Sequence, residues 1–518
     1  MANKLSAPIE TSTSTDSDEL DQRPTVVDKN NSVYPEQDDD NDNDGAPLVD
    51  VPMERPVSWK TLWIDWPLLA KYMGPGWLMS LAYLDPGNLE SDLQNGALAE
   101  YTLLWVLLWA TIAGLVLQSL SAKLGVVTGQ SLAQVCRSEY KPAVRYILWV
   151  MTEIAIIGSD IQEVLGSAIA WKILLGIPIW AGVLITGLDT FVFLGLHHFG
   201  VRLLETFIFV LVLTMMICFW VNMIDMKPSA EGIIVGTLNF TSLPPYAVSL
   251  AVGTLGCVIM PHNLYLHSAL VRSRKIDRKN LDQVAQANKY NKIESTISLF
   301  FSFLINLSVV STFAAAYFDV FCSTQETQEA RLPLDMCSAQ DILDGPNGPT
   351  CCGDIGLSVA GSALENSLGK AGLYIWAVGL LAAGQASTLT GTLAGQYVME
   401  GFLNIHMPVW KRLVLTRSIA LVPAIAVGIM ASTNAHLTDQ VNQWLNVLQS
   451  IQLPFALLPV LHFTSDRRLM QSFTNGLITQ SICWLLAFVL LAVNFLAIFQ
   501  QFLQDGEASW VLPVFIVA

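Results

Sequence analysis

Apolar runs of about 20 residues, separated by short polar loops, recur along most of this 518-residue chain. A helix of that length crosses the ~30 Å of hydrocarbon in a bilayer. Only 14% of the residues are charged and 53% are apolar, whereas an ordinary soluble domain is roughly 25% charged. The pattern predicts an all-α polytopic membrane protein with about eleven spans. The approximate spans are 68–99, 103–120, 146–169, 173–196, 203–224, 247–271, 297–317, 373–392, 414–430, 444–463 and 477–499.

The two ends of the chain depart from this pattern. Residues 1–58 are polar and acidic, with a run at Asp38-Asp39-Asp40, and cannot bury apolar surface. We interpret 1–58 as a disordered cytosolic tail and 59–499 as the transmembrane domain. The segment 500–518 ends in the apolar stretch 510–518, which is too short to span a bilayer. We expect it to be the truncated start of a twelfth helix.

The loops that carry Lys and Arg indicate how the chain is oriented. They follow spans two, six, eight and ten, and the richest contains Arg272, Arg274 and Lys275. All four lie on one side of the membrane, and positive charge is enriched in cytoplasmic loops. We therefore expect a cytosolic amino terminus. The sequence does not distinguish a plasma membrane from an endosomal or vacuolar one.

The opposite side then holds the long loop 319–369, which contains four of the eight cysteines. Because such a compartment is oxidising, we expect one or two disulfides, whose connectivity the sequence leaves open. A zinc site is the disfavoured alternative, since the loop has no His. Asn239 begins a glycosylation sequon on the same side. The loop cysteines are Cys322, Cys337, Cys351 and Cys352.

Two spans contain residues that a continuous membrane helix avoids. The first is interrupted at Asp85-Pro86-Gly87-Asn88 and the sixth at Met260-Pro261-His262-Asn263. Proline obstructs the preceding turn, and irregular backbone at membrane depth is tolerated only against protein or a wet cavity. Each break lies in the first helix of a five-span set. Matching breaks in two halves indicate a transporter with inverted repeats and a binding site near mid-membrane.

The residues at the breaks favour a metal site. Asp85 is a carboxylate within the membrane, which is costly there and functional by default. Asn88 follows one turn later, Met260 offers a thioether, and the carbonyls of Ala82 and Cys257 precede Asp85 and Met260 by one turn. Oxygen ligands suit hard cations, whereas a thioether suits softer metals. The mixture favours Mn²⁺ and Fe²⁺ over Ca²⁺; the alternative for Met260 is a core filler.

At these motifs the sequence resembles the Nramp family of proton-coupled divalent metal transporters. The resemblance runs from about Trp59 to Phe499. Its most specific signals are the two break motifs. A third is the stretch from Gly384-Gln385-Ala386-Ser387-Thr388 to Gly395-Gln396-Tyr397-Val398-Met399-Glu400-Gly401-Phe402.

The resemblance implies a LeuT-like fold, with two inverted repeats of five helices and broken helices 1 and 6. It also implies a polar ligand from span ten; Asn446 best matches that position, and Gln449 lies one turn away. The other implied metal ligands are Asp85, Asn88, Met260 and the carbonyls of Ala82 and Cys257.

Span three carries Glu153, Asp160 and Glu163, whose spacings place them on one helical face. Carboxylates in a membrane require partners or water, so this face predicts a polar track. Arg417 in span nine is a plausible partner. The positions match the proton pathway of the family, and the alternative is an ion-pair network that only locks spans three and nine together.

Two histidines complete the predicted proton route. His262 follows Met260 by two residues, and imidazole titrates near neutral pH. Asp85 itself must be deprotonated when it binds metal. For His267, a structural hydrogen bond is as good an interpretation as a proton role.

We therefore expect proton-coupled transport of Mn²⁺, Fe²⁺ and similar ions such as Cd²⁺ towards the cytosol by alternating access. The transport unit is expected to be a monomer that needs no cofactor and binds no nucleic acid. A metal-sensing receptor would need a soluble output domain, and a Na⁺-coupled solute carrier would use small residues in place of Asp85 and Met260. No phosphate-binding loop, His-Glu-x-x-His motif or nucleophile elbow indicates an enzyme.

Overall fold

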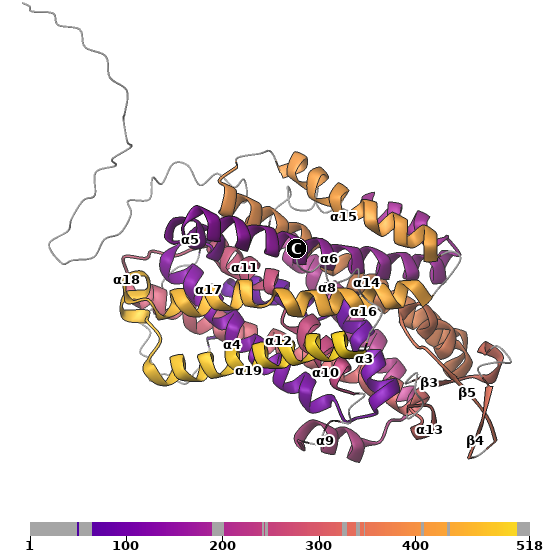
Figure 1. The fold of residues 1–518 in the computed structure, drawn as a ribbon. Helices are drawn as coiled ribbons and strands as arrows, with labels where there is room; N and C mark the ends of the chain where they lie inside the picture. The colour runs from indigo at the N-terminus through magenta and orange to yellow at the C-terminus, as the bar shows by residue number, and fades with distance from the viewer. Residues whose placement is uncertain are drawn as a thin grey trace, which may run out of the picture. The chain divides into compact units, whose positions relative to one another are not determined.

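The computed structural model is almost entirely helical in the part of the chain that it describes (Figure 1). The described residues are 49–50, 65–188, 201–240, 243, 247–323, 329–337, 342–346, 348–405, 409–431 and 436–504. The predicted tail 1–58 lies outside them except for the two-residue strand β1, and so does the stretch 510–518.

The helices follow one another with few strands between them. They are α1 (Trp66–Tyr72), α2 (Pro75–Leu81), α3 (Pro86–Ala99), α4 (Leu104–Thr128), α5 (Leu132–Glu139), α6 (Pro142–Leu175), the unlabelled helix Ile179–Leu188, α8 (Val201–Met226), α9 (Ala230–Leu238), α10 (Ala247–Val258), α11 (Pro261–Leu270), α12 (Leu281–Tyr317), α13 (Val320–Ser323), α14 (Leu357–Leu403), α15 (Val409–Ala431), α16 (His436–Gln452), α17 (Pro454–Ser465), α18 (Arg467–Met470) and α19 (Leu477–Gln504). The strands are β1 (Val49–Asp50), β2 (Arg274–Lys275), β3 (Ala330–Leu332), β4 (Ile342–Gly345) and β5 (Gly348–Gly353).

Both predicted helix breaks are present. The first separates α2 from α3, which begins at Pro86 behind the extended cap residue Asp85 (φ −72°, ψ 166°). The second separates α10 from α11, which begins at Pro261 behind the extended Met260 (φ −70°, ψ 130°). Proline suits the first position of a helix because its missing N–H would have no partner there. The same residue type therefore ends one half-helix and starts the next.

Seven helices in the described part of the chain are long and apolar enough to cross a membrane. Four of the eleven predicted spans are not among these seven. The first is divided by its break, and the apolar part of α15 is only Ser418–Met430. The third and fourth correspond to α6 and the helix Ile179–Leu188, which pass the test together but are bent by 114° at the turn between them, so that the pair adds at most one span.

Several helices extend beyond the apolar runs that predicted them. The third span was expected to end at residue 169, but α6 continues to Leu175. The seventh and eighth were expected at 297–317 and 373–392, but α12 begins at Leu281 and α14 covers Leu357–Leu403. Hydropathy marks only the part of a helix that lies in hydrocarbon, whereas backbone hydrogen bonding continues into polar turns.

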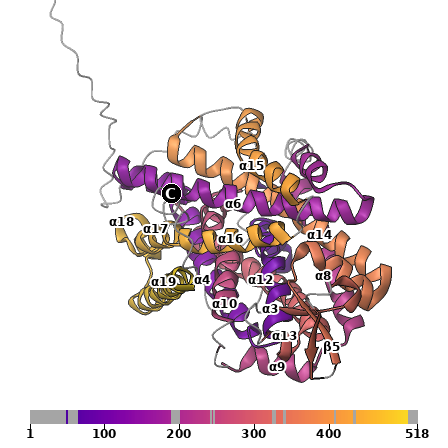
Figure 2. The ribbon, with the colours of Figure 1, turned by 45° about the vertical axis from the view of Figure 1, so that its right-hand side comes forward.

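The half-helix α3 lies at the centre of the packing. It contacts α12 along its length, and it also packs against α10, α16 and α6 (Figure 2). Gly96 allows the close approach to α12, because a Cβ atom there would lie 2.2 Å from the Val310 carbonyl oxygen. The break that begins α3 is thus surrounded by helices from both halves of the chain.

The predicted loop 319–369 contains an antiparallel sheet with strand order β3-β5-β4, and its last part, from Leu357, already belongs to α14. Disulfides join Cys322 to Cys352 and Cys337 to Cys351. We call this region the disulfide hairpin. It contacts α3 through β3, and in both ribbon views it lies far from α18 (Figures 1 and 2).

The helix α14 starts directly after the disulfide hairpin. Its first backbone N–H, that of Leu357, donates to Glu90 Oε2 of α3 at 2.7 Å. The next residue, Ser358, donates its hydroxyl to Asp439 of α16 at 2.6 Å. Gly369 then interrupts the helical backbone with φ 74°, a conformation that favours glycine.

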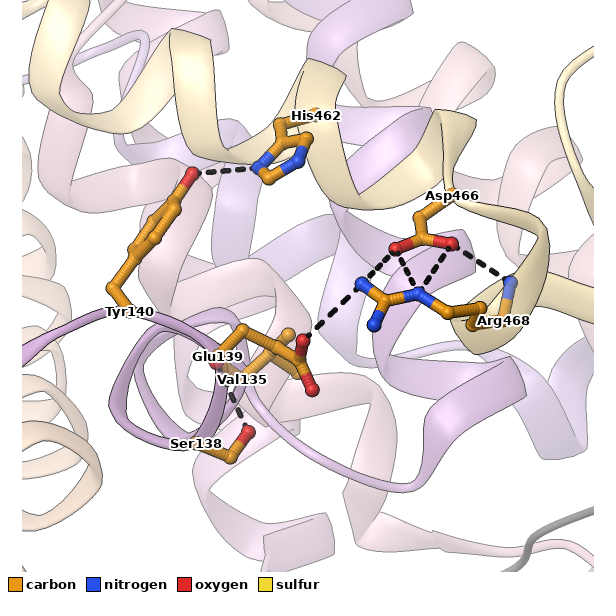
Figure 3. Close-up of polar contacts among 7 residues, drawn as sticks. All are labelled: Val135, Ser138, Glu139, Tyr140, His462, Asp466 and Arg468. Atoms are coloured by element: carbon orange, nitrogen blue, oxygen red, sulfur yellow. Dashed lines mark hydrogen bonds and ion pairs between the residues drawn. The ribbon is translucent and has the colours of Figure 1, made fainter.

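At the other end of the bundle, a polar cluster ties α5 to the end of α17 (Figure 3). Arg468 Nη2 lies 2.7 Å from Asp466 and 3.5 Å from Glu139, and Tyr140 Oη lies 2.9 Å from His462 Nδ1. The side-chain hydrogen bonds from Arg468 lower the pKa of Asp466 below its usual range. Because that folded-state pKa is lowered, the contact is fully present at neutral pH and is lost only on strong acidification.

Adding a side chain at Gly96 tests the close packing of α3 against α12. Gly96→Ala is expected to lower the free energy of unfolding by about 1–3 kcal/mol, because the new Cβ meets backbone atoms of α12 that cannot rotate away. Thermal unfolding of the purified protein in detergent measures this. Gly253→Ala in α10 is the matched control, since nothing lies within 4 Å of its added Cβ. Equal stability of the two variants would contradict the packing described.

Candidate metal-binding site

Asp85 and Asn88 form the first turn of α3. Asp85 Oδ1 accepts the backbone N–H of Asn88 at 2.8 Å and the Asn88 side-chain Nδ2 at 2.6 Å. Both side chains are buried, with 1% exposure each. Asp85 Oδ2 and Asn88 Oδ1 have no hydrogen-bond partner among the described residues. Two buried oxygen acceptors therefore remain available at the break.

The Asn88 amide also joins the two broken spans. Its Nδ2 donates to the Cys257 carbonyl of α10 at 3.0 Å and approaches the Ala82 carbonyl at 3.4 Å. Three of the predicted ligand groups, Asp85, Ala82 and Cys257, thus surround a single NH₂ group. The NH₂ group carries partial positive charge and occupies the position between these three oxygens that a cation would take. A half-turn of the amide would exchange its nitrogen for an oxygen ligand.

Met260 and His262 lie at the second break. Met260 is buried and caps α11, three residues after the Cys257 carbonyl. His262 is buried in the first turn of α11, and its Nδ1 finds no acceptor or donor within the described ranges. Met260 therefore lies between the end of α10, which contributes the Cys257 carbonyl, and the first turn of α11, which contains His262.

Asn446 reaches the first break from α16. Its Nδ2 donates to the Gly87 carbonyl at 3.2 Å, and its Oδ1 accepts from Gln162 of α6 at 2.8 Å. Gln449 donates to the same Gln162 side chain at 2.7 Å. Asn446 is thus close to the break, but its amide is engaged by Gly87 and Gln162.

Gln162 is a residue that the sequence reasoning missed. It lies between Asp160 and Glu163, and the sequence analysis assigned a role only to these two carboxylates. A Cβ atom at Gly87 would lie 2.9 Å from the Gln162 amide. The signal was present, since Asp160 to Glu163 holds three polar residues within one membrane helix. Gln162 links α6, α16 and the start of α3.

The carboxylates of α6 lie at two levels. Asp160 and Glu163 both face Gly391 of α14, because a Cβ there would lie 2.6 Å from Asp160 Oδ1 and 3.1 Å from Glu163 Oε2. Glu153, further back along α6, accepts from Trp149 Nε1 at 2.9 Å. The predicted partner Arg417 belongs to α15, but its side chain lies outside the described ones.

His267 has a clear structural partner. Its Nδ1 lies 2.8 Å from Gln118 Oε1 of α4, and both side chains are buried. Asn239, the predicted glycosylation site, follows α9 and is exposed. The sequon remains a prediction.

The comparisons with known proteins identify the family. The model of Nramp, the Natural resistance-associated macrophage protein-like family, matches residues 76–500. The chain belongs to the Nramp family. The metal transporter nramp1 homolog of Dictyostelium discoideum is 47% identical over 472 residues, 90% of this chain and 81% of that protein. Metal transporter Nramp3 of Arabidopsis thaliana is 48% identical over 444 residues, 85% of this chain and 80% of that protein.

Solved structures agree with the fold. The crystal structure of the Eremococcus coleocola manganese transporter, in complex with an aromatic bis-isothiourea substituted compound, is 29% identical with a TM-score of 0.73 and covers 90% of this chain and 92% of its own. The nucleobase-cation-symport-1 family transporter Mhp1 in a closed conformation is 13% identical, with a TM-score of 0.52, 82% coverage of this chain and 90% of its own. This second likeness concerns the fold alone. Together they confirm the predicted LeuT-like membrane fold.

Proposed function

We propose that this Nramp protein transports divalent transition metal ions across a membrane. The observation that supports this most directly is at the two helix breaks, where the Asp85 carboxylate and the Ala82 and Cys257 carbonyls all accept from the Asn88 amide. The names of the Dictyostelium and Arabidopsis relatives and of the Eremococcus structure support metal as the cargo.

The proposed ligands determine which metals are favoured. Asp85 Oδ2 and Asn88 Oδ1 are buried acceptors without partners in the described structure, and the carbonyls add two further oxygens. Met260 adds a thioether from the second break. Hard oxygens alone would serve Ca²⁺ or Mg²⁺, whereas a thioether adds affinity for softer ions. We infer a preference for Mn²⁺, Fe²⁺ and Cd²⁺ over Ca²⁺.

Loading the ion requires a local rearrangement. The Asn88 amide donates to the oxygens that the ion needs, so it must rotate to present Oδ1 as the ion arrives. Those oxygens then exchange an NH₂ partner for a metal and replace part of its hydration shell. The proposed binding step therefore breaks the present link between α3 and α10 and replaces it with a bond through the ion.

Alternating access follows from the placement of the breaks. A site between two broken helices opens to either side when the segments on one side of the break move. We propose that the ion enters from the side of the disulfide hairpin and leaves at the opposite end, towards the cytosol. Asn446 of α16 holds the Gly87 carbonyl, and Gln162 of α6 holds Asn446, so both are placed to follow movement of α3.

Proton coupling is proposed through α6 and α11. Asp85 must lose any proton it carries before it binds the ion. His262 is close to the break and can accept a proton. Asp160 and Glu163 extend a polar track along α6, with Glu153 further away and Arg417 as their proposed partner. Protons released at the break would use this track.

Removal of the carboxylate is the direct test of the site. Asp85→Ala is expected to reduce Mn²⁺ uptake into proteoliposomes by at least 100-fold, about 2.7 kcal/mol, because the ion loses its only charged ligand. Asp282→Ala, an exposed acid at the start of α12, is the matched control. Uptake by Asp85→Ala at the control rate would disprove the proposed function.

The thioether is tested by selectivity. Met260→Ala should lower the apparent affinity for Cd²⁺ and Mn²⁺ on the order of tenfold relative to Ca²⁺, because only the softer ions gain from sulfur. Competition of each ion against labelled Mn²⁺ in the same vesicles gives the ratio. An equal loss for all three ions would show that Met260 only fills space.

The imidazole is tested through pH. His262→Ala should flatten the dependence of Mn²⁺ uptake on external pH, because this imidazole is the proposed proton acceptor beside the second break. His462→Ala is the control, because that imidazole lies with Tyr140 at the far end of α17. A pH profile identical to that of the unmodified protein would remove His262 from the proton route.

A further inference from the structure

The half-helix α3 repeats its own metal-site pattern. Asn88 follows Asp85 by three positions, and Asn95 follows Asp92 by three positions. The second pair lies seven positions after the first. At 3.6 residues per turn these four positions fall on one face of the helix. We call them the α3 oxygen stripe. Its second pair lies about 10 Å beyond the first along the helix axis.

The second pair resembles the first in what it leaves unbonded. Asp92 is 1% exposed and Asn95 is 0% exposed. Asp92 Oδ2 and Asn95 Oδ1 have no hydrogen-bond partner in the described part of the chain, as is true of Asp85 Oδ2 and Asn88 Oδ1. Burying such acceptors without partners is costly, so their presence requires an explanation. Each pair offers one carboxylate oxygen and one amide oxygen.

The surroundings show which way the stripe faces. Asn95 Nδ2 donates to Thr254 Oγ1 of α10 at 2.7 Å, and Ser91 Oγ lies 3.1 Å from the same hydroxyl. Asn88 donates to the Cys257 carbonyl of the same helix. Asp92 is near enough to Asp85 and Cys257 to interact electrostatically with both. The whole stripe therefore borders α10, the first half of the other broken span.

The third acid of α3 behaves differently. Glu90 lies on the opposite face, where its Oε1 accepts from Gln94 at 2.6 Å and its Oε2 accepts from the Leu357 N–H at 2.7 Å. One oxygen is bonded within α3 and the other holds the start of α14, so both are used. The free acceptors of Asp92 and Asn95 are therefore particular to the stripe.

We propose that Asp92 and Asn95 form a second binding site for the transported divalent cation, between the first site and the disulfide hairpin. This inference rests on the proposed function. The site supplies a carboxylate oxygen and an amide oxygen but no thioether, so it does not favour Mn²⁺ over a hard ion such as Ca²⁺. It receives the ion first and passes it to the selective site at Asp85, Asn88 and Met260.

Two sites close together also assist release. Two divalent ions about 10 Å apart repel each other, so an ion that enters at Asp92 weakens the hold on an ion at Asp85. Adjacent sites that bind weakly enough to exchange are a general way to combine entry with departure. The second site is therefore expected to have the lower affinity.

Binding stoichiometry tests the proposal without transport. Free Mn²⁺ is measured by electron paramagnetic resonance in titrations of the purified full-length protein in detergent. We expect the Asp85→Ala variant to retain one Mn²⁺ per chain. Adding Asp92→Asn, which keeps the side-chain shape, should lower the affinity for that ion at least tenfold, and adding Asn95→Ala should weaken it as well. The matched control adds Glu100→Gln to Asp85→Ala instead. Glu100 lies at the end of the same helix, and this double variant should still bind one Mn²⁺ per chain.

The outcomes separate the two proposals. If the unmodified protein binds no Mn²⁺, the proposed function fails. If it binds Mn²⁺ but Asp85→Ala binds none, the second site is overturned while the first stands. A residual ion that survives Asp92→Asn is also evidence against the second site. Ca²⁺ should displace the residual ion at a concentration similar to that of Mn²⁺, and failure to do so overturns the assignment of hard ligands.

Discussion

The hydrogen bonds of the Asn88 side chain hold together the centre of the molecule. One amide group joins the Asp85 carboxylate of α3 to the Cys257 carbonyl of α10. The Ala82 and Cys257 carbonyls lie four residues before Pro86 and Pro261, which have no N–H to donate to them, and a bilayer supplies no water in its place. The bundle can enclose irregular backbone at this depth because polar side chains satisfy it. The same necessity brings together the buried oxygens that we propose as metal ligands.

Membrane spans and breaks could be predicted from the sequence because they depend on local chemistry. Proline at positions 86 and 261 cannot continue the helix that precedes it, whatever surrounds it. The break residues Asp85 and Met260 were likewise identified from their positions beside those prolines. The structure brings Asp85, Asn88, Ala82 and Cys257 together at the first break, and their role as metal ligands stays a prediction.

Choices between possible partners could not be predicted in this way. Asn446 and Gln449 were both candidates for the site, but their bonds to Gln162 depend on how α16 approaches α6. The sheet within 319–369 depends on the pairing of β3 and β4 with β5, which the spacing of the cysteines leaves open. Helix lengths were underestimated for another reason, since hydropathy reports the surrounding solvent while the helix ends where its hydrogen bonds end.

The bond between Glu90 and the Leu357 N–H has a mechanical consequence. It couples the half-helix that begins at the proposed metal site to the disulfide hairpin, which two disulfides make stiff. A tilt of that half-helix cannot occur without either carrying the disulfide hairpin with it or breaking a buried bond. An optical probe attached to β3, β4 or β5 would therefore report movement of α3 within the bilayer from the aqueous side of the membrane.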